Sequence, residues 1–166
     1  AAMELKEVIL SVVSATEKVE GRKRLQKILH LLQEASFDVR AKFRIHHYGP
    51  FSDDVVSAAE SLVLEGNLEE QAEPAGAYQT YQYLYKLPES KSQTVSTSLR
   101  RMIQDLNKFS TSALEVASTI AFYESDGLNR AKAIEKTQFI KPSKAITPVI
   151  RNAELILDLI KKKTRG

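Results

Sequence analysis

Few side chains in this sequence have the chemistry for catalysis or metal binding. Its three histidines are the side chains that titrate near neutral pH, and cysteine is absent, which excludes disulfides and thiolate chemistry. His46 and His47 are adjacent in a predicted strand, so they point to opposite faces and are poorly placed to hold one metal ion together. We expect an exposed His46, a half-buried His47, an exposed His30 on its helix, and no metal site.

The acidic residues have a structural explanation. Between Phe51 and Glu73 the charged residues are all acidic, but Asp53 and Asp54 lie in the first turn of a predicted helix, where the helix dipole favours negative charge. The sequence has no nucleophile elbow, no glycine-rich phosphate loop and no His/Asp/Glu cluster with ligand spacing. We therefore expect no catalytic residue, no cofactor and no enzymatic activity.

A row of cations is the strongest candidate for binding. Arg40, Lys42 and Arg44, here called the cationic row, share one face of a predicted strand at residues 37–45 and recur about every 7 Å, close to the spacing of backbone phosphates. The alternative is that they keep a half-exposed strand soluble, or pair with the acids of residues 69–73. A helix at residues 22–35 places Lys23, Lys27, His30 and Glu34 on its predicted outward face. The candidate partner-binding residues are Arg22, Lys23, Lys27, Arg40, Lys42 and Arg44.

The elements of the first half predict a winged-helix-like lobe at residues 4–87. Amphipathic helices at 4–18 and 22–35 precede the strand, which is followed by a corner. Ser52 is the predicted N-cap of the next helix, which ends at Gly66. Strands at 67–73 and 79–87 flank a predicted turn at residues 74–76 and form a hairpin. The corner consists of Tyr48, Gly49, Pro50, Phe51 and Ser52.

The second half, residues 93–163, predicts a helical lobe packed on the first. Helices are expected around 95–106, after a Ser112/Glu115 capping box and up to Gly127, from Asn129 to Lys136, and from Thr147 to about Ile160, with a frayed tail. The expected fold class is mostly helical α+β with a small antiparallel sheet, in one compact unit.

Charge distribution argues against ordinary recognition of a DNA groove. The helix before a wing normally enters the major groove, but here its outward face carries Asp53, Ser57, Glu60 and Leu64, without a basic residue. Such a face suits contact with another protein, or with the basic C-terminal helices of the same chain. The 166 residues are 43% hydrophobic and 27% charged, with a net charge of +3 and no apolar run of membrane-spanning length, so we expect a cytoplasmic protein without a membrane partner.

Two motifs carry a family resemblance. The run from Gly21 to Ile28, GRKRLQKI, together with Tyr48 to Ser52, resembles the YwgA family of uncharacterised bacterial and archaeal proteins, as does Ala131–Lys136 with Ile140-Lys141-Pro142. Residues 21–54 are also distantly similar to the Panacea domain. The YwgA resemblance implies no activity, substrate or cofactor. Panacea-type proteins are antitoxins or adaptors, which would imply a partner-binding role.

These observations favour a non-catalytic regulatory protein that acts through protein contacts. The alternative is a winged-helix regulator that binds nucleic acid through the basic residues and the tail from Lys161 to Arg165, with an affinity that falls steeply with salt. Self-association is compatible with either function.

Overall fold

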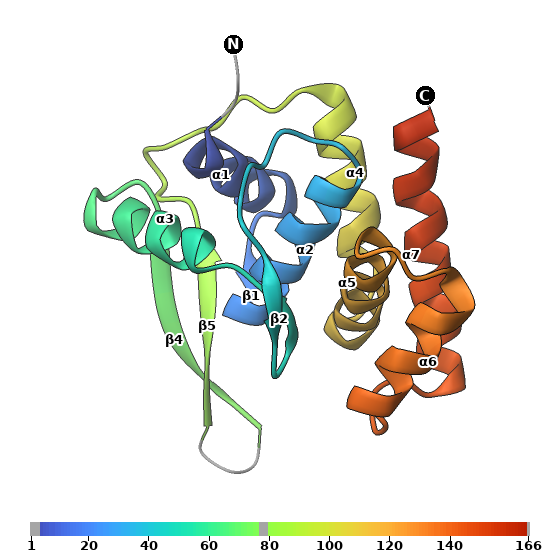
Figure 1. The fold of residues 1–166 in the computed structure, drawn as a ribbon. Coiled ribbons are helices and arrows are strands. Elements are labelled where there is room, and N and C mark those ends of the chain that lie inside the picture. Colours follow the sequence, from blue (N-terminus) through green and yellow to red (C-terminus); the bar gives the residue numbers. More distant parts are fainter. Residues whose placement is uncertain (1–3, 77–79, 166) are drawn as a thin grey trace.

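The computed structural model, which describes residues 4–76 and 80–165, confirms a mostly helical α+β fold (Figure 1). The first half contains α1 (Leu5–Thr16), β1 (Val19–Glu20), α2 (Arg22–Glu34), β2 (Arg44–His46), β3 (Gly49–Phe51), α3 (Asp53–Leu64), β4 (Glu69–Ala75) and β5 (Thr80–Lys86). The second half contains α4 (Thr97–Asn107), α5 (Thr111–Ser125), α6 (Arg130–Ile140) and α7 (Thr147–Arg165). Within the described residues, no helix combines the length and apolar character needed to cross a membrane.

The larger sheet has the order β1-β5-β4 and is antiparallel throughout. The predicted hairpin is confirmed, but its turn is not at residues 74–76, because Pro74 pairs with Tyr81 and Ala75 with Thr80 in the ladder. Gln79, predicted to begin the second strand, lies outside the described residues. The two-residue strand β1 was not predicted, and it joins α1 and α2 to the hairpin through Val19 and Tyr85.

The predicted strand at 37–45 is wrong over most of its length. Only its end is β2, which pairs with β3 across the corner. Arg40 has a φ of 56°, which interrupts an extended strand, and the side-chain amide of Gln33 takes the place of a partner strand by bonding both backbone groups of Ala41 at 2.9 Å. The predicted alternation of burial is nevertheless present, with Val39 and Ala41 buried and Arg40 and Lys42 exposed.

Some of the predicted helix ends are confirmed, and others are wrong. Gly66 has a φ of 77° after α3, and Asn129 caps α6 by accepting from the backbone of Lys132. The predicted Ser112/Glu115 capping box is wrong, because Ser110 is the N-cap of α5 and accepts from Ala113. Helix α6 extends beyond the predicted Lys136, and α7 stays helical through the tail that we expected to fray.

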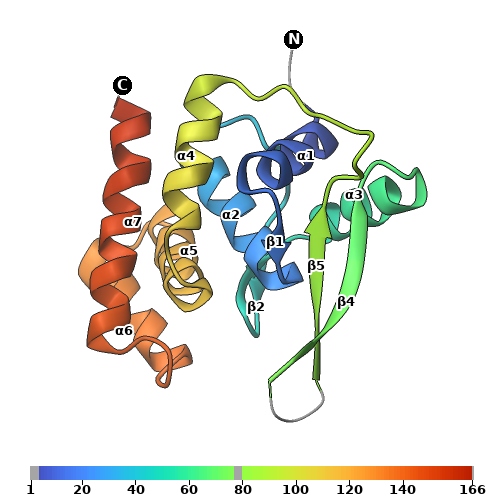
Figure 2. The same ribbon diagram turned by 180° about the vertical axis from the view of Figure 1, so that it is seen from behind.

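Helix α5 occupies the centre of the molecule. It packs against α2 and β3 on one side and against α6 and α7 on the other, while the β4–β5 hairpin projects away from this helical stack (Figures 1 and 2). Every residue from Ala113 to Ala121 is buried. One continuous hydrophobic core therefore includes side chains from α1 through α7.

Candidate functional site

Burial on all sides of α5 from Ala113 to Ala121 forces the polar residues there to find partners inside the protein. Glu115, Ser118 and Thr119 have 0% exposed surface. A buried polar group without a partner costs free energy, and a buried charge costs more. The neighbours that compensate these three side chains define the candidate site.

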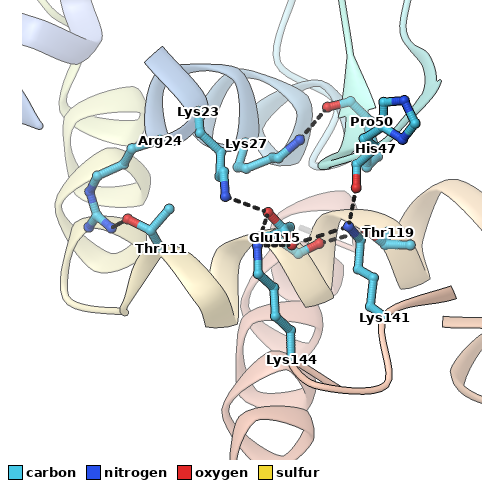
Figure 3. Close-up of polar contacts among 10 residues, drawn as sticks. All are labelled: Lys23, Arg24, Lys27, His47, Pro50, Thr111, Glu115, Thr119, Lys141 and Lys144. Atoms are coloured by element: carbon cyan, nitrogen blue, oxygen red, sulfur yellow. Dashed lines mark hydrogen bonds and ion pairs between the residues drawn. The ribbon is translucent and has the colours of Figure 1, made fainter. Parts of the chain in front are cut away.

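Three lysines converge on the carboxylate of Glu115 (Figure 3). The Nζ atoms of Lys23 and Lys141 lie 3.2 Å from Oε1 and Oε2, and Lys144 Nζ lies 3.0 Å from Oε2. Burial by itself would raise the pKa of Glu115, but the hydrogen bond from Lys144 and the charges of Lys141 and Lys23 hold this pKa below its ordinary value. Glu115 is therefore an anion that ties α2, α5 and the α6–α7 connection together.

A fourth lysine, Lys27, is buried beside this group. Its side chain is 1% exposed, and Nζ donates a 2.6 Å hydrogen bond to the carbonyl oxygen of Pro50 (Figure 3). Burial lowers its pKa to about 7 against the attraction of Glu115. The predicted outward position of Lys27 and His30 is wrong, because α5 packs on this face of α2. We call Lys23, Lys27, Lys141 and Lys144 around Glu115 the lysine cluster.

The Tyr-Gly-Pro corner seats β3 on α2 and α5. Gly49 has a φ of 88°, and a Cβ atom there would lie 2.7 Å from Thr119 Oγ1. Only glycine fits both this conformation and this close approach. The Gln26 amide bonds the backbone nitrogen and oxygen of Ser52 at 2.9 and 3.0 Å, and the ring of the half-exposed Tyr48 lies 4.4 Å from Lys23 Nζ. The corner motif therefore has a packing role in the site.

A cavity of about 430 Å³ opens beside Lys23 and Lys27, between α2, α3, β3 and β5. Its walls are mostly apolar: Leu25, Phe51, Val55, Val56 and Ala59. Lys23, Lys27 and Tyr48 also line it. Arg22 and Glu70 line it too, and their side chains form a bidentate pair at 2.8 and 3.2 Å. The cavity thus combines an apolar surface with the edge of the lysine cluster.

His30 and Ser118 form a second buried polar contact. His30 Nδ1 lies 2.6 Å from Ser118 Oγ, and its Nε2 lies 3.2 Å from Glu34. These residue types could activate a nucleophile. However, Ser118 lies within a helix at 0% exposure and His30 at 1%, so substrate cannot reach the hydroxyl. Burial lowers the pKa of His30 despite the attraction of Glu34. The arrangement satisfies buried polar atoms.

The cationic row lies outside the lysine cluster and pairs locally. Arg44 bonds Asp53 at 2.9 Å, Arg40 bonds Asp38 at 2.5 Å, and all four of these residues are exposed. The predicted alternative of pairing with the acids of residues 69–73 is wrong for these arginines.

The predicted residues thus separate into two groups. Arg22, Lys23 and Lys27 line the cavity, while Arg40, Lys42 and Arg44 do not. His46 is exposed as expected, and His47 is exposed instead of half-buried. Among the residues that the structure describes, no three His, Asp or Glu side chains are grouped to hold a metal ion.

Sequence reasoning missed Glu115, Lys141 and Lys144. The signal was a single carboxylate in a helix whose other residues from Thr111 to Tyr123 are uncharged, which is typical of a buried ion. The assumed capping box gave Glu115 a different role and concealed that signal.

Comparison with known proteins identifies one relative over most of the chain. It is a protein of Bacillus subtilis (strain 168) described as "Uncharacterized protein YwgA", 31% identical over 145 residues, which cover 84% of this chain and 85% of that protein. No family model and no solved structure matches the chain. The identity and the coverage of both proteins show that this chain belongs to the YwgA family.

Proposed function

We propose that this protein is a non-catalytic regulator that binds another protein through residues 139–146, here called the junction segment. The observation that carries this proposal is the exposure of three large apolar side chains at the end of α6 and in the connection to α7: Phe139 at 84%, Ile140 at 41% and Ile146 at 49%. Exposed apolar side chains that form a patch are typical of protein interaction sites.

The lysines of the same segment reach inward to Glu115, while Phe139, Ile140 and Ile146 stay exposed. Lys141 is buried, with Nζ bound to Glu115 and to the carbonyl oxygen of His47 at 3.1 Å, and Lys144 also reaches Glu115. Backbone bonds from Lys144 and Ala145 to Lys141 close the turn. A segment held in this way loses little conformational freedom when it binds, and this supports its use as a contact surface.

The absence of catalysis is part of the proposal. The buried Glu115 is paired with lysines, the buried Lys27 donates to the carbonyl oxygen of Pro50, and the histidine–serine contact is closed to solvent. The similarity of residues 21–54 to Panacea-type adaptors remains a prediction that favours the same role.

We also infer a winged-helix-like first lobe. Apart from the β2–β3 pair inserted between α2 and α3, the element order α1-β1-α2-α3-β4-β5 with the sheet order β1-β5-β4 supports this inference, and the β4–β5 hairpin would be the wing. In the rival function this lobe binds nucleic acid. Against it, α3 carries Asp53, Asp54 and Glu60 and no basic residue, and Arg44 is already paired.

Two experiments test the proposal. The double variant Phe139→Ser/Ile146→Ser is compared as bait with wild type and with Leu155→Ser, an exposed apolar residue of α7. We expect quantitative mass spectrometry of captured proteins to show partners lost by the double variant and retained by Leu155→Ser. Identical capture by all three baits would overturn the junction segment as the contact.

The second experiment distinguishes nucleic-acid binding, the rival function, from binding of a protein partner. A charge-reversed variant, Arg40→Glu/Lys42→Glu/Arg44→Glu, tests the cationic row with the same capture assay. Wild type is then titrated with duplex DNA at increasing salt. Tight binding at low salt that weakens steeply with salt, and that the reversed row abolishes, would favour nucleic acid over a protein partner.

A further inference from the structure

We propose that the cavity between α2 and α3 binds a small amphipathic anion, a carboxylate or phosphate on an apolar body, with its charged head at Lys23, Lys27 and Tyr48. The cavity is lined by no residue of the junction segment, so its occupation can be tested independently of the proposed protein contact. The cavity volume of about 430 Å³ lies within the range of sites that enclose small molecules.

The walls define the apolar part of the ligand. Val55, Val56 and Ala59 face the cavity from α3, Leu25 from α2 and Phe51 from β3. Leu25, Val55 and Ala59 are already among the buried core residues. Phe51 and Val56 remain half-buried, so an apolar body bound in the cavity would remove their exposed surface from water, which favours binding.

The balance of charge defines the head group. In the lysine cluster, four amines face one carboxylate, Glu115, so the cluster retains positive charge at neutral pH. The bond to Pro50 uses one donor of Lys27 Nζ, which carries two as the neutral amine and three as the ammonium. An anion at the edge of the cluster would compensate this charge in a partly desolvated setting, where ion pairs are stronger than in water.

The Arg22 side of the cavity attracts an anion less than the Lys23 side does. This difference sets the orientation of the ligand. There Arg22 is held by Glu70 through two hydrogen bonds, and its guanidinium also lies 3.7 Å from the centre of the Tyr83 ring. Glu60 and Glu70, which both line the cavity, would repel an anionic head. The head therefore belongs at Lys23 and Lys27.

Binding of 8-anilinonaphthalene-1-sulfonate, an apolar body with an anionic head, tests the site by fluorescence titration on the intact chain. The neutral N-phenyl-1-naphthylamine is the matched probe without charge. Val56→Trp fills the cavity, and we expect it to weaken the binding of both probes by about tenfold or more. Ser57→Trp, at an exposed neighbour on α3 outside the cavity, should leave the binding of both probes unchanged. Equal binding by both tryptophan variants would overturn the site.

Lys23→Gln tests the charged head of the ligand without filling the cavity, and it provides a second test if Val56→Trp fails to fold. It should weaken the sulfonate probe by about fivefold or more and leave the neutral probe unchanged, whereas Lys42→Gln, outside the cavity, should affect neither. Equal weakening of both probes by Lys23→Gln, or weakening of neither, would overturn the charged head.

Competition identifies the head group. Decanoate and decyl phosphate are expected to displace the sulfonate probe, and the stronger competitor distinguishes a carboxylate from a phosphate. Decanol, with the same chain and no charge, should compete at least about fivefold less well. Displacement by decanol equal to that by both anions, or displacement by none of the three, would contradict an amphipathic anion.

Discussion

The lysine cluster and the cationic row use the same residue types in opposite ways. In the cluster, cations from α2 and the α6–α7 connection reach one buried carboxylate on α5, so the ion pairs join segments far apart in the sequence. In the row, Arg40 pairs with Asp38 and Arg44 with Asp53, both nearby in sequence and exposed to water. Charge that organises a core thus differs from charge that covers a surface in its burial and in the reach of its pairs.

This difference explains why the cationic row, which is easy to recognise in the sequence, indicates less about the fold than the lysine cluster does. A period of two makes the cationic row conspicuous, but its charges interact in water, where ion pairs contribute little. The cluster has no periodic signature, yet removing one of its members would leave buried charge without compensation. Four measurements test this contrast.

Glu115→Gln should give the largest effect. The substitution keeps the shape of the side chain but removes the anion that pairs with three of the lysines, and we expect the free energy of unfolding to fall by about 3–5 kcal/mol in a urea titration. Glu135→Gln, on the exposed face of α6, is the control and should change it by less than about 0.5 kcal/mol. Similar losses in both variants would contradict a structural role for the cluster.

The buried amine of Lys27 predicts a dependence on pH. Its pKa falls from 10.5 in its ordinary state to about 7 in the fold, so between these values the unfolded chain binds more protons than the folded one. The stability of wild type relative to Lys27→Met should therefore rise with pH from about 7 to 10, with a limiting slope of about 1.4 kcal/mol per pH unit, and be constant below that window.

Urea titrations across this range measure the difference. Lys42→Met, at an exposed lysine of the cationic row, is the matched control. A slope of the same size in both variants would show that the dependence does not originate at Lys27.

Gly49→Ala should give an intermediate effect. The new Cβ would meet Thr119 Oγ1 at 2.7 Å in a left-handed backbone conformation, and we expect a loss of about 2–3 kcal/mol in thermal or urea unfolding. Gly66→Ala has a similar positive φ and nothing within 4 Å, so it measures the backbone strain alone. If the two variants lose equal stability, the close packing of the corner on α5 is wrong.

Local patterns in the sequence predicted much of the fold but little of the site. Apolar periodicity located α1, α2 and α7, and turn chemistry located Gly66 and the cap at Asn129, because these signals depend on neighbouring residues. The pairing of β1 with β5 depends on contacts across the chain, and a two-residue strand has no period of its own.

The site was missed for the same reason. Whether Lys27 and His30 face water depends on where α5 packs, and nothing within α2 reveals that. Lys23, Arg22 and Lys27 were predicted as binding residues on a surface, but Lys27 lies inside and reaches Pro50. Glu115 could have been recognised by its uncharged surroundings, although its three lysine partners required the tertiary structure.

Removal of the ion pair between Arg44 and Asp53 should give the smallest effect. It tests the cationic row, as Glu115→Gln tests the lysine cluster. Both side chains are exposed, so a double-mutant cycle of Arg44→Ala and Asp53→Ala should give a coupling free energy of about 0.5 kcal/mol or less. Because salt screens exposed charges, this coupling should vanish in urea titrations near 1 M NaCl. A coupling above about 1.5 kcal/mol that persists in high salt would mean that the row, like the lysine cluster, holds the structure together, and would leave it less free to bind a partner.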